Sequence, residues 1–424
     1  MGQTSFIHSD HGVLFAEGVS LESIAKQFST PTYIYSKNTL IQTFESFKKG
    51  LLKTDHLICF AVKSNSNIAI LNLFAGLGAG FDIVSGGELE RVIFAGGDPQ
   101  KIVFSGVGKT ESEISAALKA NILCFNVESR SELMRIQGVA EKINIKAPIS
   151  IRVNPDVDAK THAKISTGKK EDKFGIPISR AREVYAMAAR LPGLEVVGID
   201  VHIGSQLTDL APYGVAYEKV AELTELLRAD GHDIRRLDLG GGLGIPYESN
   251  NHHPPSPEDY CALIAEKVGH LGCEIEIEPG RFIAGNAGVF VSEVIYVKQG
   301  EDREFLIVDG AMNDLIRPAM YDAHHDIVPI QAPAAGTEYQ AYDVVGPVCE
   351  SGDTFAKGRA LAPLKAGDLI AFRSAGAYGA VMASEYNTRP LVPEVMVKGD
   401  QFAVIRPRPS LEDIINRDII PQWH

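Results

Sequence analysis

Eight short β-forming runs alternate with amphipathic helical segments between residues 57 and 277. Val, Ile and Phe dominate the runs, as strands buried on both faces require. Strand–helix alternation repeated eight times predicts a parallel (β/α)8 barrel of the TIM type. The predicted strands are Leu57–Val62, Gly80–Val84, Lys101–Phe104, Leu123–Val127, Ile149–Val153, Val196–Val201, Arg236–Leu239 and Glu274–Ile277. The predicted helices are Gly87–Ala95, Glu111–Lys119, Ser129–Ala140, Ser179–Arg190, Tyr217–Ala229 and Pro257–Leu271.

The rhythm changes after residue 284, where strands follow one another with turns and few helices between them. Residues 1–34 are expected to add a helix at Leu21–Phe28 and a strand that joins this β-rich part. We therefore predict an α/β plus all-β chain, with a barrel over residues 35–283 and a β-sandwich or β-barrel-like domain from residues 1–34 plus 284–424. The strands predicted there are Gly288–Val297, Glu304–Val308, Gln340–Val345, Asp368–Arg373, Val395–Val397 and Phe402–Ile405.

Composition argues against nucleic-acid binding, a membrane span, secretion and a metal site. The 424 residues include 41 basic and 54 acidic side chains, a net charge of −13, with no stripe of Lys and Arg that could neutralise nucleic-acid phosphates. No apolar stretch approaches the roughly 18 residues of a membrane span. Met1–Glu17 lacks the basic-then-apolar pattern of a signal peptide, so we expect a cytoplasmic protein. The five cysteines are scattered without CxxC spacing, and we expect neither a disulfide framework nor a metal site.

The functional groups of such a barrel lie where its strands end. Between them these ends carry an amine, an imidazole, a glycine-rich turn, a carboxylate and a guanidinium. In strand order they are Lys63, Ser85-Gly86-Gly87, Ser105-Gly106, Glu128, Asn154, His202-Ile203-Gly204-Ser205, Gly240-Gly241-Gly242 and Glu278-Pro279-Gly280-Arg281.

Each group has an ordinary structural alternative. Lys63, after a buried strand, suits nucleophilic amine chemistry, but a lysine reaching for solvent is as ordinary. Gly240-Gly241-Gly242 fits a phosphate cradle after strand 7, and Ile245 rules out the GxGxxG dinucleotide pattern. Glu278 can keep a pyridine nitrogen protonated or form a surface ion pair with Arg281. His202 can stack on a flat ring or sit satisfied in the core.

Together these segments resemble the alanine-racemase-like enzymes that use pyridoxal 5'-phosphate (PLP) and, within them, the group 4 decarboxylases. The resemblance runs from about Thr30 to Val404. Its motifs occur in order: Phe60-Ala61-Val62-Lys63, Phe81-Asp82-Ile83-Val84-Ser85-Gly86-Gly87-Glu88, Lys173-Phe174-Gly175, His202-Ile203-Gly204-Ser205, Gly240-Gly241-Gly242, Glu278-Pro279-Gly280-Arg281, Cys349-Glu350-Ser351-Gly352-Asp353 and Gly376-Ala377-Tyr378-Gly379.

The resemblance implies roles for these residues. Lys63 would bind PLP covalently, His202 would stack on its ring, and Glu278 would pair with the ring nitrogen. It further implies a homodimer with shared active sites, in which Cys349 of the partner subunit returns a proton to the substrate carbon. The remaining cofactor contacts implied are Ser205, Gly241, Gly280, Arg281 and Tyr378.

The residue after Cys349 bears on the substrate. Glu350 stands where similar ornithine and arginine decarboxylases have Asp, and Arg281 with Arg317-Pro318-Ala319-Met320-Tyr321 matches group members that act on diaminopimelate. That substrate has a second amino-acid head at its far end. Forked hydrogen bonds from Arg281 and Arg317 would hold its carboxylate.

In the same scheme Glu350 would hold the distal ammonium, and Tyr321 and Tyr378 would add substrate contacts. We therefore expect decarboxylation of meso-2,6-diaminopimelate to L-lysine and CO2, the final step of lysine biosynthesis. Three alternatives stay open: a decarboxylase for carboxynorspermidine, arginine or ornithine, a racemase of the same fold, and an inactive homologue that regulates a partner. The stretch Asp156–Lys173, rich in Lys, Asp, Thr and Gly, is a candidate for a loop that closes the site.

Overall fold

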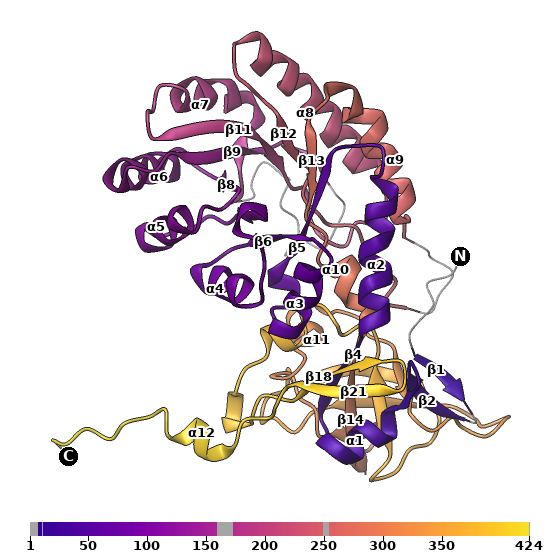
Figure 1. Ribbon diagram of the computed structural model, residues 1–424. Helices are drawn as coiled ribbons and strands as arrows, with labels where there is room; N and C mark the ends of the chain where they lie inside the picture. Colours follow the sequence, from indigo (N-terminus) through magenta and orange to yellow (C-terminus); the bar gives the residue numbers. More distant parts are fainter. Residues whose placement is uncertain (1–6, 11, 159–172, 249–253, 424) are drawn as a thin grey trace. The chain divides into compact units, whose positions relative to one another are not determined.

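The computed structural model describes residues 7–10, 12–158, 173–248 and 254–423. The chain divides into two compact units (Figure 1). The barrel unit comprises Gln42–Ile245 and His252–Phe282, and the sheet unit comprises Met1–Ile41, Pro246–Asn251 and Ile283–His424. Most of the candidate loop at 156–173 lies outside the described residues.

Eight parallel strands close into a barrel in the barrel unit. They follow one another in chain order, and the last, β13, pairs with the first, β5. All eight predicted strands are confirmed. Their bounds are β5 His56–Ala61, β6 Gly80–Ile83, β7 Ile102–Phe104, β8 Cys124–Val127, β9 Ala147–Asn154, β11 Leu194–Val201, β12 Arg236–Asp238 and β13 Glu274–Ile277; the two-residue β10 Ile176–Pro177 adds to β9.

Helices alternate with these strands, and all six predicted helices are present. Polar caps explain where several of them begin: Thr110 and Ser256 each form a reciprocal capping box with the acidic residue three positions on. The six are α4 Gly86–Phe94, α5 Glu111–Ala120, α6 Arg130–Ile143, α7 Ala181–Ala188, α8 Ala211–Ala229 and α9 Pro257–Val268. Two further helices, α2 Lys37–Gly50 and α3 Ile68–Gly76, were not predicted, and α3 is so uniformly apolar that it lacks helical periodicity.

Successive side chains of each barrel strand point alternately toward the helices and toward the barrel interior. Phe60 on β5 packs on Phe74 of α3 with ring centroids 4.4 Å apart, so Phe60 faces the helices. Its neighbour Cys59 therefore faces the interior, where it clusters with Val103 on β7. Asp82 is in register between Ala61 and Val103, which places a charged side chain inside the barrel near the strand ends.

The sheet unit is built around the long strand β14 (Gly288–Gln299), which pairs with strands on both of its edges. All six predicted strands are confirmed, and β4 (Thr32–Ser36) joins the sheet between β14 and β20, as expected for a strand of the N-terminal segment. The other strands of this sheet are β15 Glu304–Val308, β16 Ile327–Pro329, β17 Gln340–Val345, β18 Thr354–Leu361, β19 Leu369–Phe372, β20 Glu394–Lys398 and β21 Gln401–Arg406; β16 and β18 were missed.

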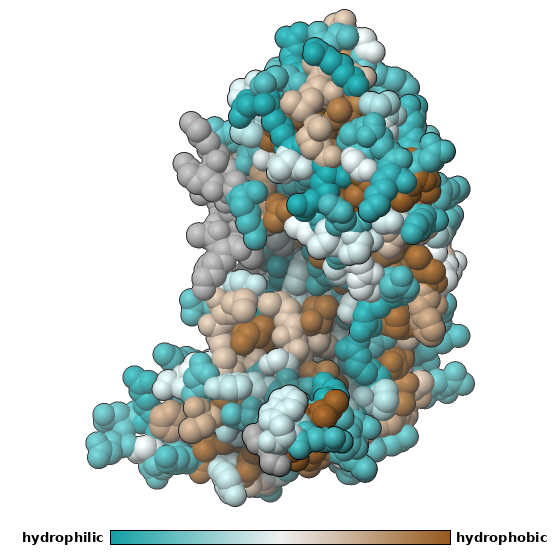
Figure 2. All heavy atoms as spheres, turned by 90° about the vertical axis from the view of Figure 1, so that its left-hand side faces the viewer, coloured by the Kyte–Doolittle hydropathy of each residue, from teal (hydrophilic) through white to brown (hydrophobic). Residues whose placement is uncertain are grey.

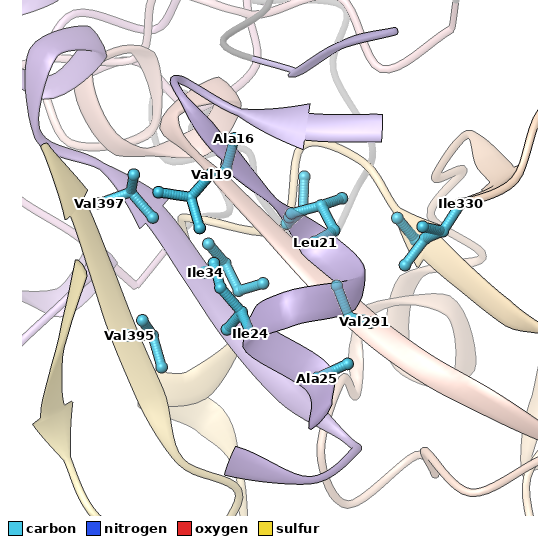
Figure 3. Close-up of a cluster of buried hydrophobic side chains, with 12 residues drawn as sticks. Ala16, Val19, Leu21, Ile24, Ala25, Ile34, Val291, Ile330, Val395 and Val397 are labelled. Carbon is cyan, nitrogen blue, oxygen red and sulfur yellow. The ribbon is translucent and has the colours of Figure 1, made fainter. Parts of the chain in front are cut away.

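Helix α1 (Leu21–Phe28), predicted with these bounds, covers one face of this sheet. Leu21 and Ile24 of this helix belong to one buried cluster with Ile34 of β4 and Val395 and Val397 of β20, and Figure 3 shows Ile24 beside Ile34. Burial of these aliphatic side chains stabilises the docking of the N-terminal segment, at about 1.5–3 kcal/mol for each large side chain. A small sheet of β1 (Ile7–Asp10), β2 (Val13–Ala16) and β3 (Val19–Ser20) precedes the helix.

The surface mixes polar and apolar groups. On the face shown in Figure 2, hydrophobic side chains are scattered among hydrophilic ones. Within the described part of the chain, none of the helices combines the length and apolarity needed to cross a membrane.

Candidate active site

Lys63 stands at the end of the first barrel strand. Strand β5 runs directly into a single 3-10 turn, Val62–Ser64, that carries Lys63. The Lys63 side chain is one-third exposed, and its Nζ contacts Oδ2 of the fully buried Asp82 on β6. A fixed carboxylate thus holds a lysine amine at the barrel mouth, where it is still open to reactants.

Glu278 lies at the end of the last strand, among other acids. Its Oε1 accepts a hydrogen bond from Ser105 Oγ at 3.4 Å. Asn126 Nδ2 in turn donates to Ser105 Oγ at 3.2 Å and to Asp238 Oδ2 at 3.0 Å. Burial, with repulsion from Asp238 and Asp82, raises the pKa of Glu278 well above its ordinary value. A carboxyl in this state can supply a proton to a basic nitrogen beside it.

His202 presents a neutral ring next to Glu278. Burial, with the positive charges of Arg152 and Lys63, lowers the pKa of His202 well below its ordinary value. Its Nδ1 accepts a hydrogen bond from the Gly241 amide at 3.2 Å, which leaves the proton on Nε2. Nδ1 lies 3.8 Å from Glu278 Oε2. An uncharged, flat imidazole of this kind is suited to stacking on an aromatic ring.

The glycine turn after β12 packs closely against the His202 ring and the backbone of Glu278. A Cβ at Gly241 would lie 2.2 Å from the carbonyl oxygen of Glu278. Gly240 has a φ of +66°, and a Cβ there would lie 2.6 Å from His202 Nδ1. Only glycines let the backbone amides come this near, and such amides can cradle an anion.

Ser205 and Arg281 add donors at the same mouth. Arg281 Nε and Nη2 donate to Ser205 Oγ at 3.2 and 3.1 Å. Gly280 permits the tight turn before Arg281, because a Cβ there would lie 2.9 Å from the side chain of Ser64. A hydroxyl, a guanidinium and glycine amides together suit a phosphate dianion.

These groups fit PLP. The barrel unit brings together seven of the predicted residues: Lys63, His202, Ser205, Gly241, Glu278, Gly280 and Arg281. Between them they offer an amine for an aldehyde, an acid for a ring nitrogen, a flat ring and a phosphate cradle. Each requirement of the cofactor meets a matching group.

The other predicted residues lie in the sheet unit. Arg317 and Tyr321 are the first and last residues of the short helix α11 (Arg317–Tyr321), and i, i+4 spacing puts them on one side of it. Arg317 is buried at 6% exposure, and its Nη1 donates to His325 Nε2 at 2.9 Å. Tyr378 is half-buried with a φ of +56°, a backbone conformation that non-glycine residues rarely adopt.

A tight turn presents Cys349 and Glu350, which are both exposed. The buried Asp353 organises this turn by accepting the amides of Met312 and Val348, each at 2.7 Å. Hydrogen bonding to Glu350 raises the pKa of Tyr386. The thiol and the carboxylate are therefore accessible on a rigidly anchored turn.

Sequence reasoning gave no role to Asp82, Asn126, Asp238 or His325. Asp82 and Asn126 each stand inside a short, otherwise apolar strand, and Asp238 is the last residue of the short strand β12. That pattern was the available signal, because a polar residue within a buried strand must face a polar interior. His325 had no such signal, since its partner is set by the tertiary fold.

Comparison with known proteins agrees with this geometry. The family profile described as pyridoxal-dependent decarboxylase, pyridoxal binding domain, matches residues 37–285. Diaminopimelate decarboxylase from Vibrio cholerae serotype O1 is 52% identical over 410 residues, 96% of this chain and 97% of the relative. The one from Pseudomonas fluorescens is 51% identical over 413 residues, 97% of this chain and 98% of the relative.

A solved structure extends the match to three dimensions. The crystal structure of diaminopimelate decarboxylase from Helicobacter pylori complexed with L-lysine superposes with a TM-score of 0.89 at 45% identity, covering 93% of this chain and 98% of that one. Identity at this level over nearly the whole length shows membership of the family and not only a shared fold. The chain belongs to the pyridoxal-dependent decarboxylases and, within them, to the diaminopimelate decarboxylase family.

Proposed function

We propose that this chain uses PLP to decarboxylate meso-2,6-diaminopimelate to L-lysine and CO2, the final step of lysine biosynthesis. The observation that carries the proposal is the barrel mouth, where an amine, a buried acid, a neutral imidazole and an anion cradle converge. The H. pylori relative was solved with L-lysine, the product of this reaction.

The barrel unit supplies all but one of the proposed cofactor contacts. When bound, PLP supplies an electron sink for the electron pair that CO2 leaves behind. Lys63 would hold the cofactor through its amine, and Asp82, which contacts Lys63 Nζ, would take up and return the proton of that amine. Glu278 would keep a proton at the ring nitrogen, and His202 would stack on the ring. Ser205, Gly241, Gly280 and Arg281, with Tyr378, bind the phosphate end.

Residues of the sheet unit select the substrate. Arg317, together with Arg281, binds the distal carboxylate, and Glu350 binds the distal ammonium. Tyr321 and Tyr378 add hydrogen bonds. A substrate without the distal carboxylate forgoes charge-assisted hydrogen bonds to these two arginines, at a cost of about 1.5–3 kcal/mol.

The proton that replaces CO2 comes from a thiol. Cys349 is exposed on its turn, as a proton donor to another subunit's substrate must be. In this scheme the enzyme is a cytoplasmic homodimer, and each site takes Cys349 of the partner subunit.

The deciding experiment measures CO2 release from meso-diaminopimelate with added PLP, beside arginine, ornithine and carboxynorspermidine. Release from diaminopimelate alone supports both the activity and the roles of Arg281, Arg317 and Glu350. Release only from another substrate keeps the decarboxylase chemistry and overturns the substrate assignment. Racemisation without CO2 release, or PLP binding without turnover, overturns the activity itself.

A further inference from the structure

The guanidinium of Arg317 contacts two aromatic rings, those of His325 and Tyr247. Nη1 donates to Nε2 of His325 at 2.9 Å. The guanidinium carbon also lies 4.4 Å from the ring centroid of Tyr247, so the tyrosine face covers the cation. The two rings meet edge to face, with centroids 5.4 Å apart and planes at 82°. One contact thus fixes an edge of the guanidinium and the other fixes its plane.

The protonation state of His325 follows from its partners. A guanidinium has only donors, so Nε2 of His325 must accept and carries no proton. The ring proton is therefore on Nδ1, which donates to the carbonyl oxygen of Arg373 at 2.8 Å. A neutral acceptor orients Arg317 without cancelling its charge, as a carboxylate partner would.

His325 is itself held in place by its backbone. Its carbonyl oxygen accepts a hydrogen bond from Nη1 of Arg359, on β18, at 2.9 Å. The imidazole is buried at 2% exposure. Because α11 ends at Tyr321 and β16 begins at Ile327, the short connection returns His325 to the start of the helix that carries Arg317.

We propose that His325 and Tyr247 are positioning residues that orient Arg317 for forked binding of the substrate's distal carboxylate. The inference rests on the proposed function, which gives Arg317 that role. Its physical basis is preorganisation: an arginine fixed in its binding geometry loses less side-chain entropy when the carboxylate arrives. In this role both residues act through Arg317, on substrate affinity and selectivity.

Two amide substitutions separate the contacts of His325. His325→Gln places an amide near the Nε2 position and keeps an acceptor for Arg317. His325→Asn places it near Nδ1 and keeps a donor for the Arg373 carbonyl, while the contact with Arg317 is lost. His324→Asn is the matched control, because His324 contacts Arg359 and Asp326 in the same segment.

The readout compares ligands with and without the distal carboxylate. Decarboxylation at one head leaves the far head intact, so L-lysine retains the carboxylate that Arg317 binds. The diamine 1,5-diaminopentane has both amines of lysine and no carboxylate. We expect His325→Asn to raise the KM for diaminopimelate and the inhibition constant of L-lysine about tenfold. The inhibition constant of the diamine, the PLP dissociation constant and kcat should change by less than about twofold.

His325→Gln, two variants of Tyr247 and melting temperatures separate a loss of substrate binding from a loss of folding. His325→Gln should keep the lysine constant within about threefold of the wild type. Tyr247→Leu removes the ring face and should weaken L-lysine about threefold to fivefold, while Tyr247→Phe preserves the ring face and should weaken it less. Melting temperatures of all variants identify any loss that comes from unfolding.

The inference is overturned if His325→Asn changes the lysine constant no more than His324→Asn does, or weakens lysine and the diamine equally. It is also overturned if Gln and Asn at position 325 are equally harmful. The proposed function is judged separately, by wild-type release of CO2 from diaminopimelate. Binding of L-lysine needs no turnover, so the two results can fail independently.

Discussion

Single side chains at the barrel mouth set the chemistry. Lys63 combines partial exposure with contact to the fully buried Asp82. This environment differs from that of Lys109, which is buried and bound to Glu132 and to two carbonyl oxygens. The first lysine is open to a reactant, and the second is locked into the structure.

Replacing Lys63 with Ala removes the proposed covalent anchor. We expect kcat for CO2 release to fall by at least about a thousandfold, because both cofactor attachment and proton exchange are lost. Steady-state CO2 release is the measurement, and Lys119→Ala, at an exposed lysine on α5, is the control. Activity within tenfold of the wild type would remove Lys63 from the mechanism.

Substitution of the single residue Arg317 tests the substrate assignment. Arg317→Ala should raise the KM for diaminopimelate about a hundredfold, since a forked, charge-assisted pair is lost. The PLP dissociation constant, measured by absorbance titration, should stay within about threefold. Arg317→Lys should rescue little, because an ammonium cannot form the planar fork. Equal loss of PLP and substrate binding would mean that Arg317 is structural.

Loops and turns decide how near these groups approach one another. The glycines after β12 let the backbone reach His202 and Glu278, and no side chain fits there. The loop after β6 is tied by Glu88, whose Oε2 accepts the Val84 amide at 2.7 Å. The glycine turn and the Glu88 hydrogen bond each fix a segment of backbone and not a single side chain.

A methyl group tests the glycine turn. Gly241→Ala puts a Cβ 2.2 Å from the Glu278 carbonyl oxygen, so the turn must move. We expect PLP affinity to fall at least about tenfold. Gly138→Ala, in helix α6 with open space around its Cβ, is the control and should stabilise the fold by about 0.5–1 kcal/mol. Unchanged PLP affinity in Gly241→Ala would contradict a close-approach role.

The Glu88 carboxyl makes the stability of the folded chain depend on pH. Burial is the main cause that raises the pKa of Glu88 from 4.5 to about 7. The folded chain therefore holds this proton more tightly than the unfolded chain. The resulting stabilisation is complete below pH 4.5 and is lost as pH rises through 7.

Glu88→Gln keeps an acceptor for Val84 and removes the titration. Between pH 5 and 7.5, the free energy of unfolding of the wild type relative to this variant should fall by about 2 kcal/mol. Chemical denaturation at several pH values measures it. A difference between the two proteins that does not change with pH would contradict the shifted pKa.

The whole molecule divides the proposed tasks between two units. The barrel unit holds the proposed cofactor-binding groups other than Tyr378, and the sheet unit holds Arg317, Tyr321, Cys349, Glu350 and Tyr378. The proposed sharing of sites between subunits would account for a proton donor that lies exposed on an anchored turn.

Mixing two inactive variants tests shared sites. In a heterodimer of Lys63→Ala and Cys349→Ala chains, one site combines both substitutions and the other has neither. Random exchange should therefore restore about a quarter of wild-type specific activity. Each variant incubated alone is the control, and size-exclusion chromatography checks the dimer. If mixing restores nothing while subunits exchange, each site belongs to one chain.

The sequence by itself determined the repeating architecture. Eight apolar runs separated by amphipathic segments specify strands and helices through local periodicity, and the residues following each run specify the mouth chemistry. Where periodicity was weak, as in the apolar α3 and the short β16, elements were missed. Lys63, His202, Glu278 and Arg281 could be predicted because they stand at strand ends.

Only the tertiary structure decided which side chains share an environment. Asp82, Asn126 and Asp238 come from three different strands, and closure of the barrel joins them to the groups around Glu278. His325 meets Arg317 because a turn folds back onto α11, and Tyr247 meets both from a segment about 70 residues away in sequence. Hydrogen-bond partners and burial depend on distance in space, and a linear pattern contains only distance along the chain.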